Sequence, residues 1–122
     1  ADWFVANLPP DGIPYWDFRD PSIPSAPRDA SAAAIAACGL YRLARAGESG
    51  DAYRGVADAL LRSLCTDHVS GDPRTMSLTE HSVGAKPQGL EVDVGLIYTD
   101  YYLLDAIVTR SGVSLGLGDL SG

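Results

Sequence analysis

The most continuous apolar pattern in the chain covers Ala30–Ala46, where apolar side chains occupy most of a helical circumference. Asp29 stands directly before this run and can cap the free amides of Ser31 and Ala32, and Gly47 follows its last residue. A helix that is apolar nearly all round must be enclosed by other elements. The pattern therefore predicts an inner helix.

Two more segments show helical spacing. Residues Ala52–His68 place apolar side chains at i, i+3 and i+4 and charged side chains on the opposite face, which predicts an outer helix that faces solvent. Residues Ile97–Arg110 carry tyrosines and aliphatic side chains around most of the circumference, which predicts a second inner helix. The sequence thus indicates an all-α fold in which inner and outer helices alternate.

The part of the chain before these helices is rich in proline. Ala1–Leu8 is amphipathic and predicts the last turns of a helix whose start lies outside this chain. Asp11-Gly12 predicts a turn, and a short extended aromatic run follows at Ile13–Phe18. The prolines of Arg19–Arg28 predict an ordered strap rather than a helix. Asp20 lies in this strap with no helix after it, so we expect its carboxylate at the surface.

A long segment rich in glycine, Val69–Gly95, separates the second and third helices. It predicts a loop with one short strand near Thr75–Leu78, and loops of this length are usually functional. After the last helix, Val113–Gly122 is rich in glycine, serine and leucine and predicts a frayed tail.

Length and composition narrow the function classes. The 122 residues suffice for one domain, and a hydrophobic content of 46% is typical of a globular chain. The net charge of −7 argues against nucleic acid as a partner, because phosphate binding requires clustered lysine and arginine. No apolar run is long enough to span a bilayer, so no membrane partner is expected. No signal peptide is visible in this segment, which favours a cytoplasmic location.

The cysteines and histidines do not form a metal-binding pattern. Cys38 and Cys65 lie in helical segments and are either buried free thiols or a disulfide pair. His68 and His81 do not stand at zinc-ligand spacing from them, so we expect no metal and no cofactor. We expect His81 to pack within its loop rather than to act as a base.

Two helices that are apolar nearly all round cannot both be enclosed by a chain of this length. The chain therefore either self-associates through them or is a piece of a larger barrel.

Four stretches of the chain carry a further signal in their order and spacing. They are PYWDF (14–18), PRDASAAAI (27–35), SVGAKP (82–87), and EVDV with IYTDYY (91–94 and 97–102). Together they resemble the C-terminal part of the unsaturated glucuronyl hydrolases, glycoside hydrolase family 88. The resemblance covers roughly residues 1–110 and implies helical hairpins that form part of a six-hairpin (α/α) barrel.

The resemblance implies a specific chemistry. Enzymes of this family remove the unsaturated uronic acid that polysaccharide lyases leave at the non-reducing end of an oligosaccharide. They hydrate the C4–C5 double bond of the uronyl ring, with an aspartic acid as general acid and base. The family's catalytic aspartates lie upstream of the part matched here, so no residue of this chain inherits a catalytic role.

The expected partners follow from the same resemblance. They are an unsaturated uronic-acid oligosaccharide and either the remaining N-terminal part of the barrel or a second copy of the chain. The chain alone is expected to be inactive. The alternative is a non-catalytic helical-hairpin module for carbohydrate binding or assembly.

Three candidate substrate-binding residues flank the strap. Tyr15 and Trp16 either stack on a sugar face or wedge between helices and order the strap. Arg28 either pairs with the substrate carboxylate or forms a structural ion pair with Asp29 or Asp17.

Five further candidates stand at helix starts and in the long loop. Asp29 either only caps its helix or, together with Ser31, also lines the cleft. Ser82 and Lys86 either hold a carboxylate or sulfate of the substrate or are solvated loop residues. Asp100 is expected to be a buried, hydrogen-bonded carboxylate, which either braces the helix against the loop or forms part of the cleft wall.

Overall fold

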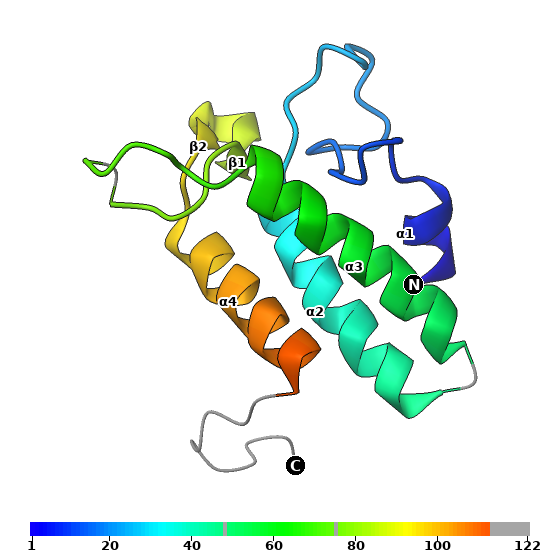
Figure 1. The fold of residues 1–122 in the computed structure, drawn as a ribbon. Helices are drawn as coiled ribbons and strands as arrows, with labels where there is room; N and C mark the ends of the chain where they lie inside the picture. The colour runs from blue at the N-terminus through cyan, green and yellow to red at the C-terminus, as the bar shows by residue number, and fades with distance from the viewer. Residues whose placement is uncertain (48, 75, 113–122) are drawn as a thin grey trace.

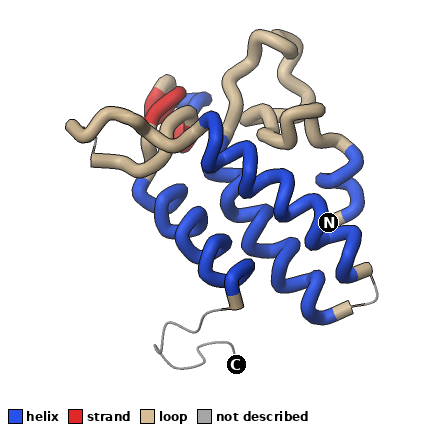
Figure 2. Tube along the Cα trace, viewed as in Figure 1, coloured by secondary structure: helices blue, strands red, loops and turns tan. Residues whose placement is uncertain are grey.

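Three long helices dominate the fold. The computed structural model describes residues 1–47, 49–74 and 76–112, and its long helices are α2 (Ala30–Ala46), α3 (Gly50–Asp67) and α4 (Ile97–Ser111). They lie side by side with α2 in the middle, α2 and α4 running in one direction and α3 in the other (Figure 1). Figure 2 shows that the loops gather at the end of the bundle where α2 and α4 begin. The predicted helical fold is confirmed.

The helix ends follow local signals. The bounds predicted for α2 are those observed, and Asp29 is its N-cap residue. The other two helices begin or end within two residues of the predicted positions. Gly112 ends α4 in the left-handed conformation at φ 71°, which glycine adopts without steric cost.

The core lies where α2 meets its two neighbours. Ala33, Ala34 and Ala37 of α2 are fully buried, and their small side chains let α3 and α4 pack closely on either side. Leu60 and Leu64 of α3 fill the space between, and burying each such side chain stabilises the fold by about 1.5–3 kcal/mol. The full cluster consists of Ile13, Ala30, Ala33, Ala34, Ala37, Cys38, Leu40, Tyr41, Ala57, Leu60, Leu61, Leu64, Leu103 and Ala106.

Both predicted inner helices keep an apolar stripe in solvent. On α4 this stripe consists of Ile97, Tyr101 and Leu104, which are 86%, 65% and 53% exposed. On α2 it consists of Ile35 and Leu43, which are 43% and 45% exposed. Among the described residues, α2 packs mainly against α3 and α4, and no further long helix covers the remaining sides of α2 and α4.

The proline-rich strap is ordered by Asp20, and the expectation that this carboxylate lies at the surface is wrong. Asp20 is only 9% exposed, and it accepts hydrogen bonds from the indole Nε1 of Trp16 and from the backbone N (2.8 Å) and hydroxyl of Ser22. Before the strap, the short helix α1 (Asp2–Ala6) buries none of its residues, and the ring of Phe18 packs against it.

The strand expected near Thr75–Leu78 is wrong, because the described residues 76–78 are in a loop. Pairing occurs further along the chain, where β1 (Ser82–Ala85) and β2 (Leu90–Val94) form an antiparallel pair joined by the short 3-10 helix η1 (Lys86–Gln88). Gly89, at φ 69°, provides the left-handed turn residue just before β2. The fold is therefore helical with one small sheet that the sequence analysis did not predict.

Both cysteines are free. Cys38 is buried, its thiol donates to the carbonyl of Tyr102 (3.1 Å), and burial raises its pKa to about 12. Cys65 is exposed, so the expectation of a buried thiol is wrong for this residue. Within the described ranges, no helix is long and apolar enough to cross a membrane. The expected tail, Val113–Gly122, lies outside the described residues.

Candidate functional site

Four of the candidate site residues meet at the end of the bundle where α2 and α4 begin. Asp29 and Ser31 lie at the start of α2, Asp100 lies in the first turn of α4, and Ser82 opens β1 beside them. The loop that follows α3 reaches the same end, as Figure 1 shows. We refer to this region as the helix-start end.

Asp29 connects the start of α2 to the hairpin. Its Oδ1 atom accepts hydrogen bonds from the backbone N (3.0 Å) and hydroxyl (2.6 Å) of Ser31 and from the backbone N of Val83 (3.2 Å). The backbone N of Asp29 in turn donates to the carbonyl of Pro14 (2.9 Å). One residue thus holds the strap side, the helix and the hairpin together.

Asp100 plays the corresponding part at the start of α4. Its carboxylate accepts hydrogen bonds from the backbone N atoms of Leu78 and Thr79, both at 2.8 Å, and from the Thr79 hydroxyl at 2.7 Å. The Ser77 hydroxyl adds a longer bond of 3.2 Å. This arrangement supports the role of a brace between helix and loop.

Ser82 faces the protein interior. Its hydroxyl lies 3.1 Å from that of Thr99, and both residues are fully buried. This burial supports a structural role and leaves the hydroxyl no direct access to a substrate. Lys86 begins η1, and its side chain lies outside the described part of the structure.

The strap candidates form a second group. The guanidinium of Arg28 lies 4.0 Å from the ring centroid of Tyr15 and donates to Asp11 Oδ1 (3.0 Å) and to the carbonyl of Ile13. The structural ion-pair partner is therefore Asp11, and the alternative of a pair with Asp29 or Asp17 is wrong, because the turn at residues 11–12 brings Asp11 next to Arg28. Trp16 orders the strap through its bond to Asp20.

Sequence reasoning missed the partners of these residues. Thr79 and Thr99 are both fully buried and bonded to candidate residues. Thr79 stands 21 positions from Asp100, and Thr99 stands 17 positions from Ser82, so no local motif marks either pair.

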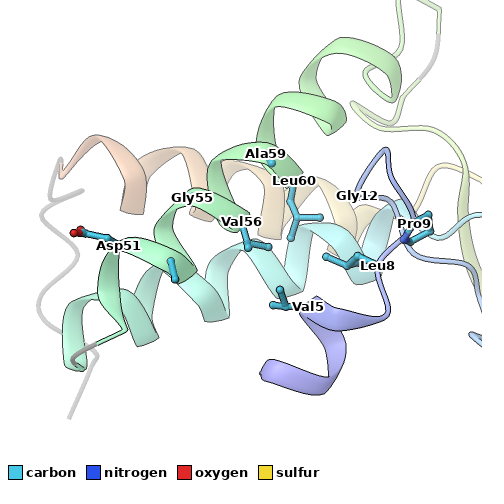
Figure 3. Close-up of a pocket in the computed structure, with 10 residues that line it drawn as sticks. Val5, Leu8, Pro9, Gly12, Asp51, Gly55, Val56, Ala59 and Leu60 are labelled. Atoms are coloured by element: carbon cyan, nitrogen blue, oxygen red, sulfur yellow. The ribbon is translucent and has the colours of Figure 1, made fainter.

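A surface groove runs along α3. It has a volume of about 450 Å³ and separates α1 and the turn after it from α3, with Val5, Leu8 and Val56 among the apolar residues that line it (Figure 3). Asp51 is its one charged residue within the described chain. None of the candidate site residues lines this groove.

The central helix α2 has a parallel neighbour, α4, and an antiparallel neighbour, α3, with a short connection from α2 to α3 and a long loop from α3 to α4. This arrangement defines a helical-hairpin segment of the type that builds (α/α) barrels. No family model matches the chain. Curated relatives do match, and they are unsaturated glucuronyl hydrolases and unsaturated chondroitin disaccharide hydrolases. Identity is 39% over 115 residues with the former from Formosa agariphila and 37% over 116 residues with the latter from Streptococcus pneumoniae.

The match is nearly complete for this chain but partial for its relatives. The alignment with the Formosa agariphila protein covers 89% of this chain, and the alignment with the Streptococcus pneumoniae protein covers 88%. Each covers only 28% of the relative. The chain therefore spans little more than a quarter of the length of the curated relatives it matches.

Solved structures agree. The unsaturated glucuronyl hydrolase of Bacillus sp. GL1, which is responsible for the degradation of glycosaminoglycan, superimposes with a TM-score of 0.84 at 30% identity over 89% of this chain and 30% of that one. An unsaturated glucuronyl hydrolase specific for heparin superimposes with a TM-score of 0.84 at 34% identity, over 91% of this chain and 31% of that one. A variant of the Streptococcus agalactiae unsaturated glucuronyl hydrolase, complexed with dGlcA-GalNAc6S, superimposes with a TM-score of 0.83 at 30% identity, over 89% of this chain and 30% of that one. The homologues of this chain are unsaturated glucuronyl hydrolases, as the sequence motifs predicted.

Proposed function

We propose that the chain is the C-terminal portion of an unsaturated uronyl hydrolase that acts on oligosaccharides generated by polysaccharide lyases. The observation that carries the proposal is the agreement of sequence and fold with hydrolases of this kind, at 30–39% identity and TM-scores of 0.83–0.84. The sequence identity and the structural superposition both extend over nearly the whole chain. The similarity to these hydrolases therefore includes the amino-acid sequence as well as the packing of the helices.

The proposed reaction adds water across the C4–C5 double bond of the terminal uronyl ring. An aspartic acid outside this chain delivers a proton to the double bond and activates the water, and the resulting hemiketal opens and releases the remaining sugar. The geometry of Asp29 and Asp100 supports their exclusion from this role. Both carboxylates accept hydrogen bonds from backbone amides, which is the arrangement of a cap or brace rather than of a proton donor.

In this proposal the helix-start end forms one wall of the substrate cleft. Asp29, Ser31, Ser82 and Asp100 hold the wall through the bonds described above. The residues proposed to contact the anionic oligosaccharide directly are Lys86 and the three strap candidates, Tyr15, Trp16 and Arg28. Each of those three strap residues is partly exposed. The guanidinium of Arg28 lies beside Asp11 and Tyr15 and is partly exposed, and guanidinium groups pair well with carboxylates.

The rest of the barrel is the proposed partner of the two open stripes. Ile97, Tyr101 and Leu104 recur at helical spacing on α4, as Ile35 and Leu43 do on α2, and exposed rows of this kind are covered in a packed helical barrel. About seven-tenths of each relative's length has no counterpart in this chain, which is ample for further helical hairpins. The alternative is that two copies of the chain associate through the same stripes. Such self-association would favour the non-catalytic helical-hairpin module over the hydrolase.

A chimeric enzyme tests the proposal. Residues 1–112 replace the matching segment of the Bacillus sp. GL1 hydrolase, and loss of the double-bond absorbance of an unsaturated uronyl disaccharide reports turnover. We expect activity above that of the enzyme lacking the segment. A matched chimera with Ala37→Pro, which breaks α2, serves as the inactive control because proline inside a helix costs about 3 kcal/mol or more. A folded but inactive chimera contradicts the hydrolase and favours the non-catalytic module.

A further inference from the structure

The two histidines of the chain lie against each other at the helix-start end. His68 is the C-cap residue of α3 and His81 directly precedes β1. Their ring centroids are 5.6 Å apart, and the ring planes are almost perpendicular at 86°. This edge-to-face contact joins the end of one helix to the end of the long loop.

Backbone hydrogen bonds fix the pair on both sides. The carbonyl of His81 accepts from the backbone N of Ala30, the first residue of α2 (3.0 Å), and the carbonyl of His68 accepts from the backbone N of Glu80 (2.8 Å). His81 has φ 61° and is the one non-glycine residue in the left-handed region among the described residues. Such a conformation costs free energy and persists where surrounding contacts hold it.

The surroundings of His68 disfavour a positive charge. Its Nδ1 atom is buried and has no hydrogen-bond partner, whereas a protonated ring needs partners for both N–H groups. Burial and, after it, the neighbouring His81 lower the pKa of His68 below its ordinary value of 6.5. Three influences favour the cation: the carboxylates of Asp67 and Asp11, the backbone of Glu80, and the negative end of the α3 dipole. The desolvation outweighs them.

His81 differs because its ring is about half exposed. Its Nε2 atom lies 4.0 Å from a carboxylate oxygen of Glu80, which is itself partly exposed. Solvent and this carboxylate can accommodate a charge on His81, but a charge on His68 would then face a second cation across the ring contact.

We propose that the His68–His81 contact is an acid-released latch. With both rings neutral, it holds Glu80 and His81 against the ends of α3 and α2. With both rings protonated, the two cations repel, and the bonds from Ala30 to His81 and from Glu80 to His68 open. Release loosens the loop that leads into Ser82 and Val83. The latch does not depend on the proposed hydrolase activity.

Hydrogen exchange of single amides, measured by NMR on the 122-residue chain at pH 7.5 and 5.0, tests the latch. Protection is corrected for the intrinsic exchange rate at each pH. The protection of the Ala30 and Glu80 amides should fall between the two pH values, by up to about tenfold per pH unit for each proton that opening takes up. The Asp29 amide is a matched control, because it is adjacent to Ala30 but bonded to Pro14 and should change by less than about twofold.

Two variants separate the latch from general acid loosening. His68→Phe keeps an aromatic ring in contact and cannot be protonated, so the protection of the Ala30 and Glu80 amides should stay level with pH. His81→Asn removes the other ring while keeping a residue that tolerates the left-handed region, and it should reduce the pH response to the part that the burial of His68 causes. If far-UV circular dichroism shows that His68→Phe does not fold, His81→Asn serves as the test of the latch. A fall in protection as large as that of the wild type in a folded variant overturns the proposal, as does wild-type protection that is absent at pH 7.5 or unchanged at pH 5.0.

Discussion

The carboxylate of Asp29 accepts a hydrogen bond from the backbone amide of Val83 at 3.2 Å, although the two residues are 54 positions apart. The same oxygen caps α2 through Ser31. A helix cap is normally a local device, but this one also holds the hairpin in place. The start of an inner helix and the long loop are therefore fixed by one side chain.

Asp29→Ala should destabilise the chain by about 1–2 kcal/mol, because it removes a helix cap and leaves the Val83 amide without this acceptor. The urea midpoint of unfolding measures the effect. Asp20 is unsuitable as a neutral comparison, since it is itself buried and hydrogen-bonded. Asp51→Ala is a better control, because Asp51 is exposed and its side chain forms no hydrogen bond within the described chain, so only a first-turn charge worth about 0.3–1 kcal/mol is lost. Equal midpoints for the two variants would show that Asp29 is not a cap.

Asp100→Asn should loosen the loop before β1 more than it affects the helices. The amide group replaces one acceptor oxygen by a donor, which then faces the backbone N–H of Leu78 or Thr79, at a cost of about 1–3 kcal/mol. Limited trypsin cleavage after Arg74, a loop residue three positions before Ser77, should become faster. Asp105→Asn is the control on the same helix, because among the described contacts Asp105 interacts with Arg42 and Cys38 of α2 and not with the loop before β1. Unchanged cleavage in the Asp100 variant would argue against the brace.

These two carboxylates show what the sequence could predict. The cap by Asp29 was predictable because its signal is local: an aspartate directly precedes an unbroken helical run. The Asp100 brace was predictable only as a buried carboxylate in need of partners, since Thr79 lies 21 positions away; its hydrogen bonding is confirmed, but Asp100 is only partly buried. Leu90–Val94 alternates apolar and acidic residues, a strand signal that the surrounding glycines obscure. The Asp11 partner of Arg28 depends on how the strap folds back, which no short motif encodes.

Acid should weaken the fold through Asp58. Hydrogen bonds from the Tyr41 hydroxyl (2.7 Å) and from Arg110 (2.8 Å) lower the pKa of this carboxyl below its ordinary value of 3.8. The unfolded chain therefore takes up the proton first as the pH falls. The stabilisation is present above about pH 3.8 and is lost below it, down to the lowered pKa. Urea midpoints at pH 5, 4 and 3 should show the gap between wild type and Asp58→Asn closing as the pH falls.

Asp72→Asn is the control for this pH dependence. The pKa of Asp72 is lowered as well, but its partner Arg74 is only two residues away. The unfolded chain can keep much of this local attraction, so folding changes the Asp72 pKa little and the midpoint gap should stay small at every pH. A larger pH effect for Asp72→Asn than for Asp58→Asn would contradict the assignment.

The purified chain should not hydrolyse an unsaturated uronyl disaccharide. The reason is that the proposed function assigns catalysis to an aspartic acid outside this chain, and Asp29 and Asp100 serve as hydrogen-bond acceptors for backbone amides. The absorbance of the conjugated double bond should stay constant within background over the course of the assay. Turnover above background would require one of the acids present here to take the catalytic role.

The chain should self-associate when it is purified without the rest of a barrel. Leu104 and Tyr101 on α4 are 53% and 65% exposed, and covering apolar surface is favourable by roughly 25 cal/mol per Å². Light scattering should therefore show a dimer or larger species that Leu104→Glu shifts toward monomer. Met76→Glu adds the same charge to an exposed apolar loop residue that belongs to neither stripe, and it should leave the assembly unchanged. A monodisperse wild-type monomer with a cooperative thermal transition would show that the stripes need no partner, since an unsatisfied apolar face of this kind would otherwise drive association or prevent a cooperative fold.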